Sequence, residues 1–136
     1  MDDPNPDIVF LTLEQVIVLH EQGIKQFTPQ ESLIVLNHDA LDSAVKTPGQ
    51  TWGGAFLYGS LAEMAAAYLI GLACNHAFEN GNKRVALSSC STFLRMNGYR
   101  MTLTQDEAER LVLQVVTHGI EREEVVNILN EAIEAL

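Results

Sequence analysis

The stretch His76-Ala-Phe-Glu-Asn-Gly-Asn-Lys-Arg84 places a histidine, a tight turn, two carboxamides and two cations close together in the chain. Asn80-Gly81 is a turn dipeptide, because both residues tolerate positive φ angles. Helical apolar periodicity resumes after the turn, so the pattern predicts a helix that begins near Asn82. The main-chain amides from Gly81 to Arg84 are then free donors at the positive end of the helix dipole, an arrangement that binds phosphate.

Three side chains of this stretch suit chemistry at a bound phosphate. Lys83 and Arg84 add positive charge, and an arginine can hold two phosphate oxygens at once. His76 precedes the turn and is placed to act as general base for a hydroxyl that attacks the phosphate. From the residues alone, the alternative interpretation is a structural corner between two helices with surface charges.

The same stretch resembles the signature of the Fic/Doc family, His-x-Phe-x-(Asp/Glu)-(Gly/Ala)-Asn-(Gly/Lys)-Arg. The matching positions are His76, Phe78, Gly81, Asn82, Lys83 and Arg84. Asn80 departs from the signature, since the family usually carries an acidic residue there. With Lys at position 83, the stretch resembles the motif of the Doc branch, the death-on-curing toxins, whereas the adenylylating Fic enzymes carry Gly at that position. Residues 11–20, 40–44 and 93–98 also resemble the Doc pattern, in the same order.

The resemblance implies a role for each position. His76 is the general base on a target hydroxyl, and Phe78 is a hydrophobic plug that holds the loop. The phosphate-binding residues are Gly81, Asn82, Lys83 and Arg84. Arg84 is also catalytic, because it stabilises charge during phosphoryl transfer.

Asn80 occupies the usual position of the Mg²⁺ carboxylate, and its side chain is an amide. Mg²⁺ prefers anionic oxygen, so an amide oxygen is a weaker ligand. Two alternatives stay open for the neighbouring Glu79, which either substitutes as a ligand or is a solvated bystander.

The resemblance implies a toxin kinase that uses ATP and Mg²⁺. The activity is transfer of the γ-phosphate to a Thr of elongation factor Tu, which stops translation. Self-inhibited Fic proteins carry a Ser/Thr-x-x-x-Glu-(Gly/Asn) helix. Thr117 and Glu121 have this spacing, but Arg122 stands where the inhibitory motif has Gly or Asn, so the motif is incomplete here. We therefore expect a separate antitoxin that binds an apolar groove. An adenylyltransferase and a non-catalytic binding protein of the same fold are the alternatives.

Composition predicts one domain spanning residues 1–136, of which 47% are apolar. The net charge of −10 disfavours a nucleic-acid binder, although residues 76–100 hold four cations against one acid. No apolar run is long enough to span a bilayer, and residues 1–5 do not resemble a signal peptide. We expect a cytoplasmic protein in which Cys74 and Cys90 are buried free thiols.

Helical periodicity predicts an all-α bundle built around two helices that flank the motif loop. Capping boxes predict helix starts at Thr12, Thr28, Ser60 and Thr104. The helix after Ser60 is apolar nearly all round, so we expect it at the centre. We also expect a short helix over residues 31–36, a connector over 99–103 and a last helix over 125–136. Residues 46–59 form a loop whose aromatic residues anchor it to the body or, alternatively, make it a flap beside the site.

Overall fold

The computed structural model describes residues 7–136, which form six α-helices and short strands. The helices are α1 (Leu13–Phe27), α2 (His38–Lys46), α3 (Leu61–Cys74), α4 (Asn82–Met96), α5 (Gln105–Val116) and α6 (Arg122–Glu131). A 3₁₀ turn, Thr47–Gly49, follows α2. The antiparallel strand pairs are β1 (Thr51–Trp52) with β2 (Ala55–Phe56), and β3 (Tyr99–Met101) with β4 (Ile133–Ala135). The mostly helical fold confirms the expected class.

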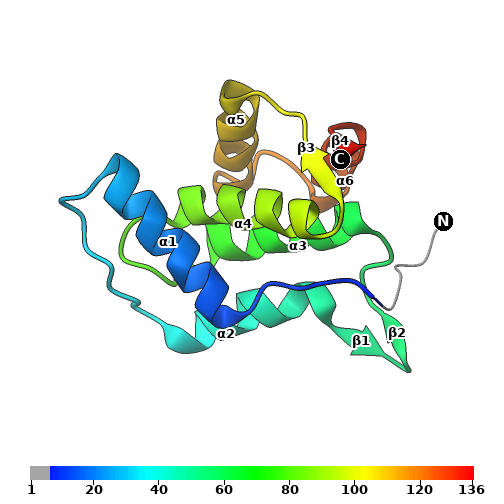
Figure 1. Ribbon diagram of the computed structural model, residues 1–136, viewed down its shortest axis with the longest axis horizontal. Helices are drawn as coiled ribbons and strands as arrows, with labels where there is room; N and C mark the ends of the chain where they lie inside the picture. The colour runs from blue at the N-terminus through cyan, green and yellow to red at the C-terminus, as the bar shows by residue number, and fades with distance from the viewer. Residues whose placement is uncertain (1–6) are drawn as a thin grey trace.

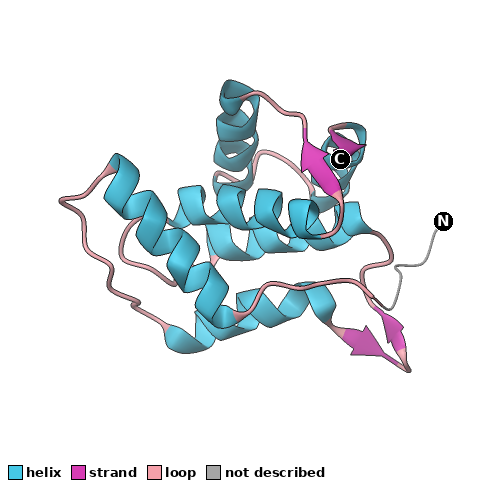
Figure 2. Ribbon diagram, viewed as in Figure 1, coloured by secondary structure: helices cyan, strands magenta, loops and turns pink. Residues whose placement is uncertain are grey.

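Helices α3 and α4 lie side by side at the centre, joined by the motif loop (Figure 1). In Figure 2, α1 and α2 cover one side of this pair, and α5 and α6 cover the other. Most of α3 is buried, including Met64, Tyr68 and Leu69, as its apolar pattern predicts. Because α3 is packed on several sides, it gives the motif loop a rigid mount.

Three of the four predicted caps form where helices begin. Thr12 and Thr104 make complete capping boxes at α1 and α5. Ser60 caps α3 through the Glu63 amide, while the Glu63 carboxylate accepts from the Gly59 N–H. These hydrogen bonds satisfy first-turn donors and fix the start of each helix.

The prediction of a helix over residues 31–36 is wrong. No helix begins at Thr28. The chain makes a single turn there, in which the Glu31 N–H donates to the Thr28 carbonyl, and Val35 then forms a β-bridge with Phe78. The helix signal at Pro29 is local, whereas the backbone groups of this segment find partners in the motif loop. We name residues 28–37 the α1–α2 segment.

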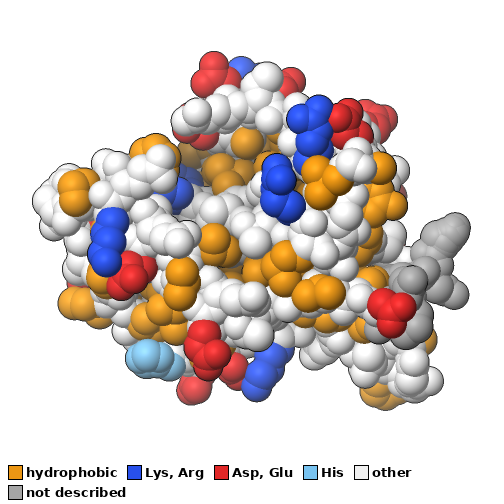
Figure 3. All heavy atoms as spheres, in the orientation of Figure 1, with side chains coloured by type: hydrophobic (Ala, Val, Ile, Leu, Met, Phe, Trp, Pro, Cys, Tyr) orange, Lys and Arg blue, Asp and Glu red, His pale blue; other side chains and the backbone are white. Residues whose placement is uncertain are grey.

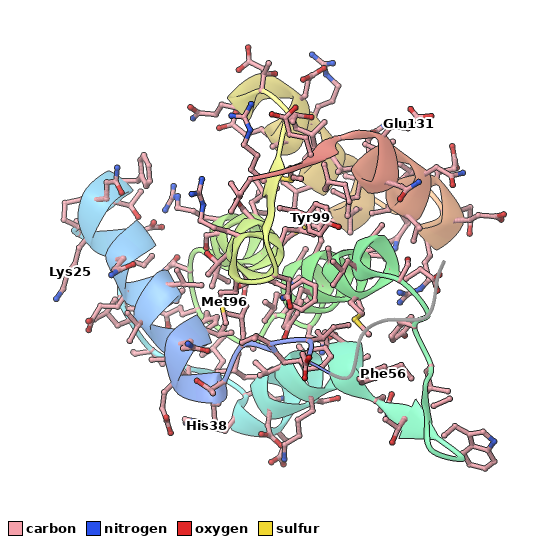
Figure 4. The ribbon with its side chains drawn as sticks, turned by 45° about the vertical axis from the view of Figure 1, so that its right-hand side comes forward. Lys25, His38, Phe56, Met96, Tyr99 and Glu131 are labelled. Carbon is pink, nitrogen blue, oxygen red and sulfur yellow. The ribbon has the colours of Figure 1, made fainter. Side chains whose placement is uncertain are left out.

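The aromatic residues of the 46–59 loop behave differently from one another. Phe56 and Tyr58 pack against the core, but Trp52 is 81% exposed at the β1–β2 hairpin, so it is not an anchor. Figure 4 places this hairpin, marked by Phe56, on the opposite side of the molecule from Lys25 near the end of α1. Gly81 and Arg84 of the motif pack against that end of α1, so the alternative of a flap beside the site is wrong.

The last helix is shorter than predicted. It ends at Glu131, and β4 then pairs with β3, which occupies the expected 99–103 connector. The pairing is accompanied by an ion pair between Arg100 and Glu134. The apolar residues beyond Glu131 have helical spacing, but they form a strand because the edge of β3 is free to pair with them.

Candidate functional site

His76 leaves the end of α3 in a left-handed backbone conformation. Its φ angle is +50°, directly after the C-cap residue Asn75, and its side chain is exposed. This conformation costs a residue with a Cβ about 1 kcal/mol relative to glycine. The following residue, Ala77, is buried, so the loop turns inward immediately after it presents the imidazole to solvent.

The motif loop is held by main-chain hydrogen bonds from the α1–α2 segment. The Ala77 carbonyl accepts from the Leu36 N–H at 2.7 Å and from the Asn37 N–H at 3.2 Å. The Glu79 N–H donates to the Ile34 carbonyl at 3.0 Å. A segment far away in sequence thus supplies one wall of the loop.

Phe78 fixes the loop against α1. Its side chain is 1% exposed, and its ring stacks on His20 with centroids 3.7 Å apart and an interplanar angle of 11°. His20 is itself buried at 3% exposure, and its Nε2 lies 2.7 Å from the Asn80 carbonyl oxygen. Burial lowers the pKa of His20, so the neutral ring donates from Nε2–H to that carbonyl. His20 lies on the apolar stripe of α1, and its ring is satisfied at the edge of the core.

Gly81 is required by both conformation and space. Its φ angle is +81°, and a Cβ at this position would lie 3.0 Å from Ile24 Cδ1 and 3.4 Å from the His20 ring. A side chain would therefore be strained and would push the loop off α1. The turn that the Asn80-Gly81 pair predicts is present at this close contact.

Asn82 closes the loop from inside. Its Oδ1 accepts from the Phe78 N–H at 3.1 Å, and its Nδ2 donates to the Phe78 carbonyl at 2.9 Å. Both polar groups of this side chain are thus engaged with the loop. The second N–H of Nδ2 and the main-chain N–H of Asn82 have no protein acceptor within residues 7–136 and stay available to an anion.

The first turn of α4 leaves its donors open. Gly81 provides no side-chain cap, and within residues 7–136 the N–H groups of Gly81, Asn82, Lys83 and Arg84 donate to no protein acceptor. The positive end of the helix dipole adds to these N–H groups, and Lys83 is exposed beside them. This arrangement is suited to phosphate oxygens.

Arg84 rests on the end of α1. Its guanidinium carbon lies 4.8 Å from the centre of the Phe27 ring, and Nη1 donates to Thr28 Oγ1 at 3.4 Å. Its methylene stem crosses α1 at Gly23, where a Cβ would come within 3.0 Å of Arg84 Cδ. These contacts hold a charged group, half-buried, beside the open amides.

A small polar cluster adjoins the turn on its other side. Ser32 Oγ donates to Glu79 Oε1 at 2.6 Å and accepts from Asn80 Nδ2 at 3.4 Å. The side chains of Glu79 and Asn80 therefore point toward the same hydroxyl. No group of three or more His, Cys, Asp or Glu residues among residues 7–136 could hold a metal ion by itself.

A groove of about 320 Å³ lies between the start of α4 and α5. Its lining residues are Lys83, Arg84, Leu87, Glu109, Val112 and Leu113. Leu113 is 53% exposed, so the groove combines an apolar wall with the two motif cations.

The structure brings the predicted site residues into one loop and one helix start. Three contacts were not predicted as part of the site: His20, Ser32 and Thr28. The apolar periodicity of α1 could find His20 as a buried residue, but not its bond to Asn80. Nothing in the sequence marks Ser32 or Thr28 as part of the site, because both reach the motif through the α1–α2 segment.

Comparisons with known proteins agree with the motif. A model of the Fic/DOC family matches residues 10–94. Toxin Doc of Mycolicibacterium smegmatis (strain ATCC 700084 / mc(2)155) is 38% identical over 95 residues, which cover 68% of this chain and 73% of that protein. Protein kinase doc of Escherichia phage P1 is 46% identical over 41 residues, covering 30% of this chain and 32% of the phage protein.

Proposed function

Because this chain belongs to the Fic/DOC family, we propose that it transfers the γ-phosphate of ATP to a hydroxyl group of a protein target. The observation that carries the proposal is the open first turn of α4, with Lys83 and Arg84, on the same loop as the exposed His76. One similar protein is named a kinase, and it supports phosphoryl transfer in particular.

Each group has a role in the proposed reaction. His76 accepts the proton of the target hydroxyl as its oxygen bonds to the γ-phosphorus, and the bond to the β,γ-bridging oxygen breaks to release ADP. The N–H groups of Gly81 and Asn82 and the side chain of Lys83 hold phosphate oxygens. Arg84 stabilises the charge that develops during transfer.

The polar cluster beside the turn fits a Mg²⁺ ion that ATP brings with it. Mg²⁺ usually keeps several waters and takes one or two protein oxygens together with substrate phosphates. The side-chain oxygen of Asn80 would hold the ion. Glu79, whose carboxylate accepts a hydrogen bond from the same Ser32 hydroxyl, is the nearby acidic group. When bound, Mg²⁺ neutralises phosphate charge and lowers the barrier to transfer.

The proposed biological role is that of a toxin with an antitoxin. The resemblance supports a Thr of elongation factor Tu as the target, and arrest of translation in the cytoplasm as the result. Within residues 7–136, no helix combines the length and apolarity needed to cross a bilayer. Apolar residues lie exposed over α1 and the α1–α2 segment (Figure 3), among them Phe27, Ile34 and Leu36. A folding antitoxin segment can cover such a surface, and we propose that it inhibits the site from there.

ATP labelled at either the γ- or the α-phosphate tests this function. The purified chain is incubated with elongation factor Tu, and label on the factor is measured with wild type and His76→Ala. We expect γ-label only, lost in His76→Ala while its circular dichroism stays native. Transfer of α-label would identify an adenylyltransferase. No transfer of either label to the factor or to a bacterial lysate would favour a non-catalytic binding protein.

A further inference from the structure

We propose that His20 is a positioning residue that aims the Gly81 N–H into the phosphate site. Its effect on turnover rests on the proposed function, whereas its effect on ligand binding does not. His20 lies on α1, outside the motif. It contacts the motif through one buried ring.

Three contacts to the motif converge on this ring. One face stacks on Phe78 at a centroid distance of 3.7 Å. Nε2 lies 2.7 Å from the Asn80 carbonyl oxygen. The Gly81 backbone passes so close that a Cβ there would lie 3.4 Å from both Cδ2 and Nε2. The orientation of the Asn80–Gly81 peptide is therefore set by His20.

The hydrogen bond from His20 to the Asn80 carbonyl also fixes the direction of the Gly81 N–H, because both groups belong to one peptide bond. In a planar trans peptide, the carbonyl of one residue and the N–H of the next point in opposite directions. There are no cis bonds among the described residues. Because the Asn80 carbonyl points at α1, the Gly81 N–H points away from α1. It has no protein acceptor within residues 7–136 and is available beside the open amides of α4.

An apolar residue of similar size could fill the same space but could not donate. The Asn80 carbonyl would then lose its partner beside a buried side chain, and the peptide would be free to rotate. Rotation would turn the Gly81 N–H out of the site while leaving the Phe78 stack in place. A histidine at this position is thus suited to setting the peptide direction as well as packing.

Two substitutions separate the ring from the donor. His20→Phe keeps an aromatic ring against Phe78 and removes the Nε2–H. His20→Gln removes the ring and restores an N–H donor at comparable reach. His118→Asn is the control, because His118 is exposed after α5 and its positive φ angle is one that asparagine tolerates.

We expect His20→Phe to lower kcat/KM for ATP by about tenfold to a hundredfold, the order seen when reacting groups are misplaced. We expect His20→Gln to recover most of this loss and His118→Asn to match wild type. In proton–nitrogen NMR spectra, ATP should shift the Gly81 amide in wild type and in His20→Gln, but not in His20→Phe. If His20→Phe is folded and its Gly81 amide responds as in wild type, the proposal is wrong.

The tautomer of His20 gives a test in the unmodified protein. Long-range proton–nitrogen correlations should show a protonated Nε2 and an unprotonated Nδ1 at neutral pH. A protonated Nδ1 with a bare Nε2 would overturn the proposal even if both variants failed to fold. A wild type that transfers no phosphate, yet shows the Nε2–H tautomer and the ATP-dependent Gly81 shift, would refute the proposed function and support the role of His20.

Discussion

The Asn82 side chain should stabilise the protein in the absence of any ligand. It bridges the N–H and the carbonyl of Phe78 through two hydrogen bonds, at 3.1 and 2.9 Å. Each such bond contributes about 1 kcal/mol net, and Phe78 is 1% exposed, so the freed groups would be poorly solvated. We therefore expect Asn82→Ala to lower the free energy of unfolding by about 2 kcal/mol.

Urea unfolding followed by far-ultraviolet circular dichroism measures this loss without ATP. Asn82→Asp is an informative second variant, because it keeps an acceptor for the Phe78 N–H and loses the donor to the carbonyl. Asn127→Ala on the exposed face of α6 is the control and should change stability by less than about 0.5 kcal/mol. If Asn82→Ala were as stable as this control, the two hydrogen bonds to Phe78 would contribute nothing to the free energy of unfolding. The role of Asn82 would then lie in ligand binding alone.

Three further predictions concern strain, pH and metal. His76→Gly should raise stability by about 0.5–1 kcal/mol in urea unfolding, because glycine relieves the positive φ, and should abolish transfer; a loss of stability would contradict it. Burial raises the pKa of Tyr68 to about 12, so its contribution to stability should be present below pH about 10 and lost as pH rises through about 12. Tyr68→Phe should flatten that alkaline decline in unfolding free energy, and an unchanged decline would refute the assignment. Asn80→Asp should lower the Mg²⁺ concentration for half-maximal transfer about tenfold, equal to about 1.4 kcal/mol; if Glu79→Gln does the damage and Asn80→Asp does little, Glu79 is the ligand.

The sequence predicts the centre of this fold better than its edges. The apolar pattern of α3 and the Asn80-Gly81 turn act locally, so the helix–loop–helix around the motif follows from residues near one another. The α1–α2 segment and β4 were mispredicted because their partners are distant. Val35 pairs with Phe78, and Ile133 pairs with Met101. Such pairings override a local helix signal.

The site shows the same division. Periodicity and spacing predict the open amides of α4 and the close turn at Gly81. They do not predict that the Asn82 side chain hydrogen-bonds to the Phe78 backbone, or that the Ser32 hydroxyl hydrogen-bonds to both Glu79 and Asn80. These contacts depend on where the loop meets α1 and the α1–α2 segment, which only the folded chain defines.

The central claim is that the motif loop and the start of α4 bind the phosphates of ATP. The most direct measurement is an NMR titration of the isotope-labelled protein with ATP, following every main-chain amide. We predict the largest shifts at Gly81, Asn82, Lys83 and Arg84, and their loss when adenosine replaces ATP. Shifts confined to another surface, or equal shifts with adenosine, would contradict the claim.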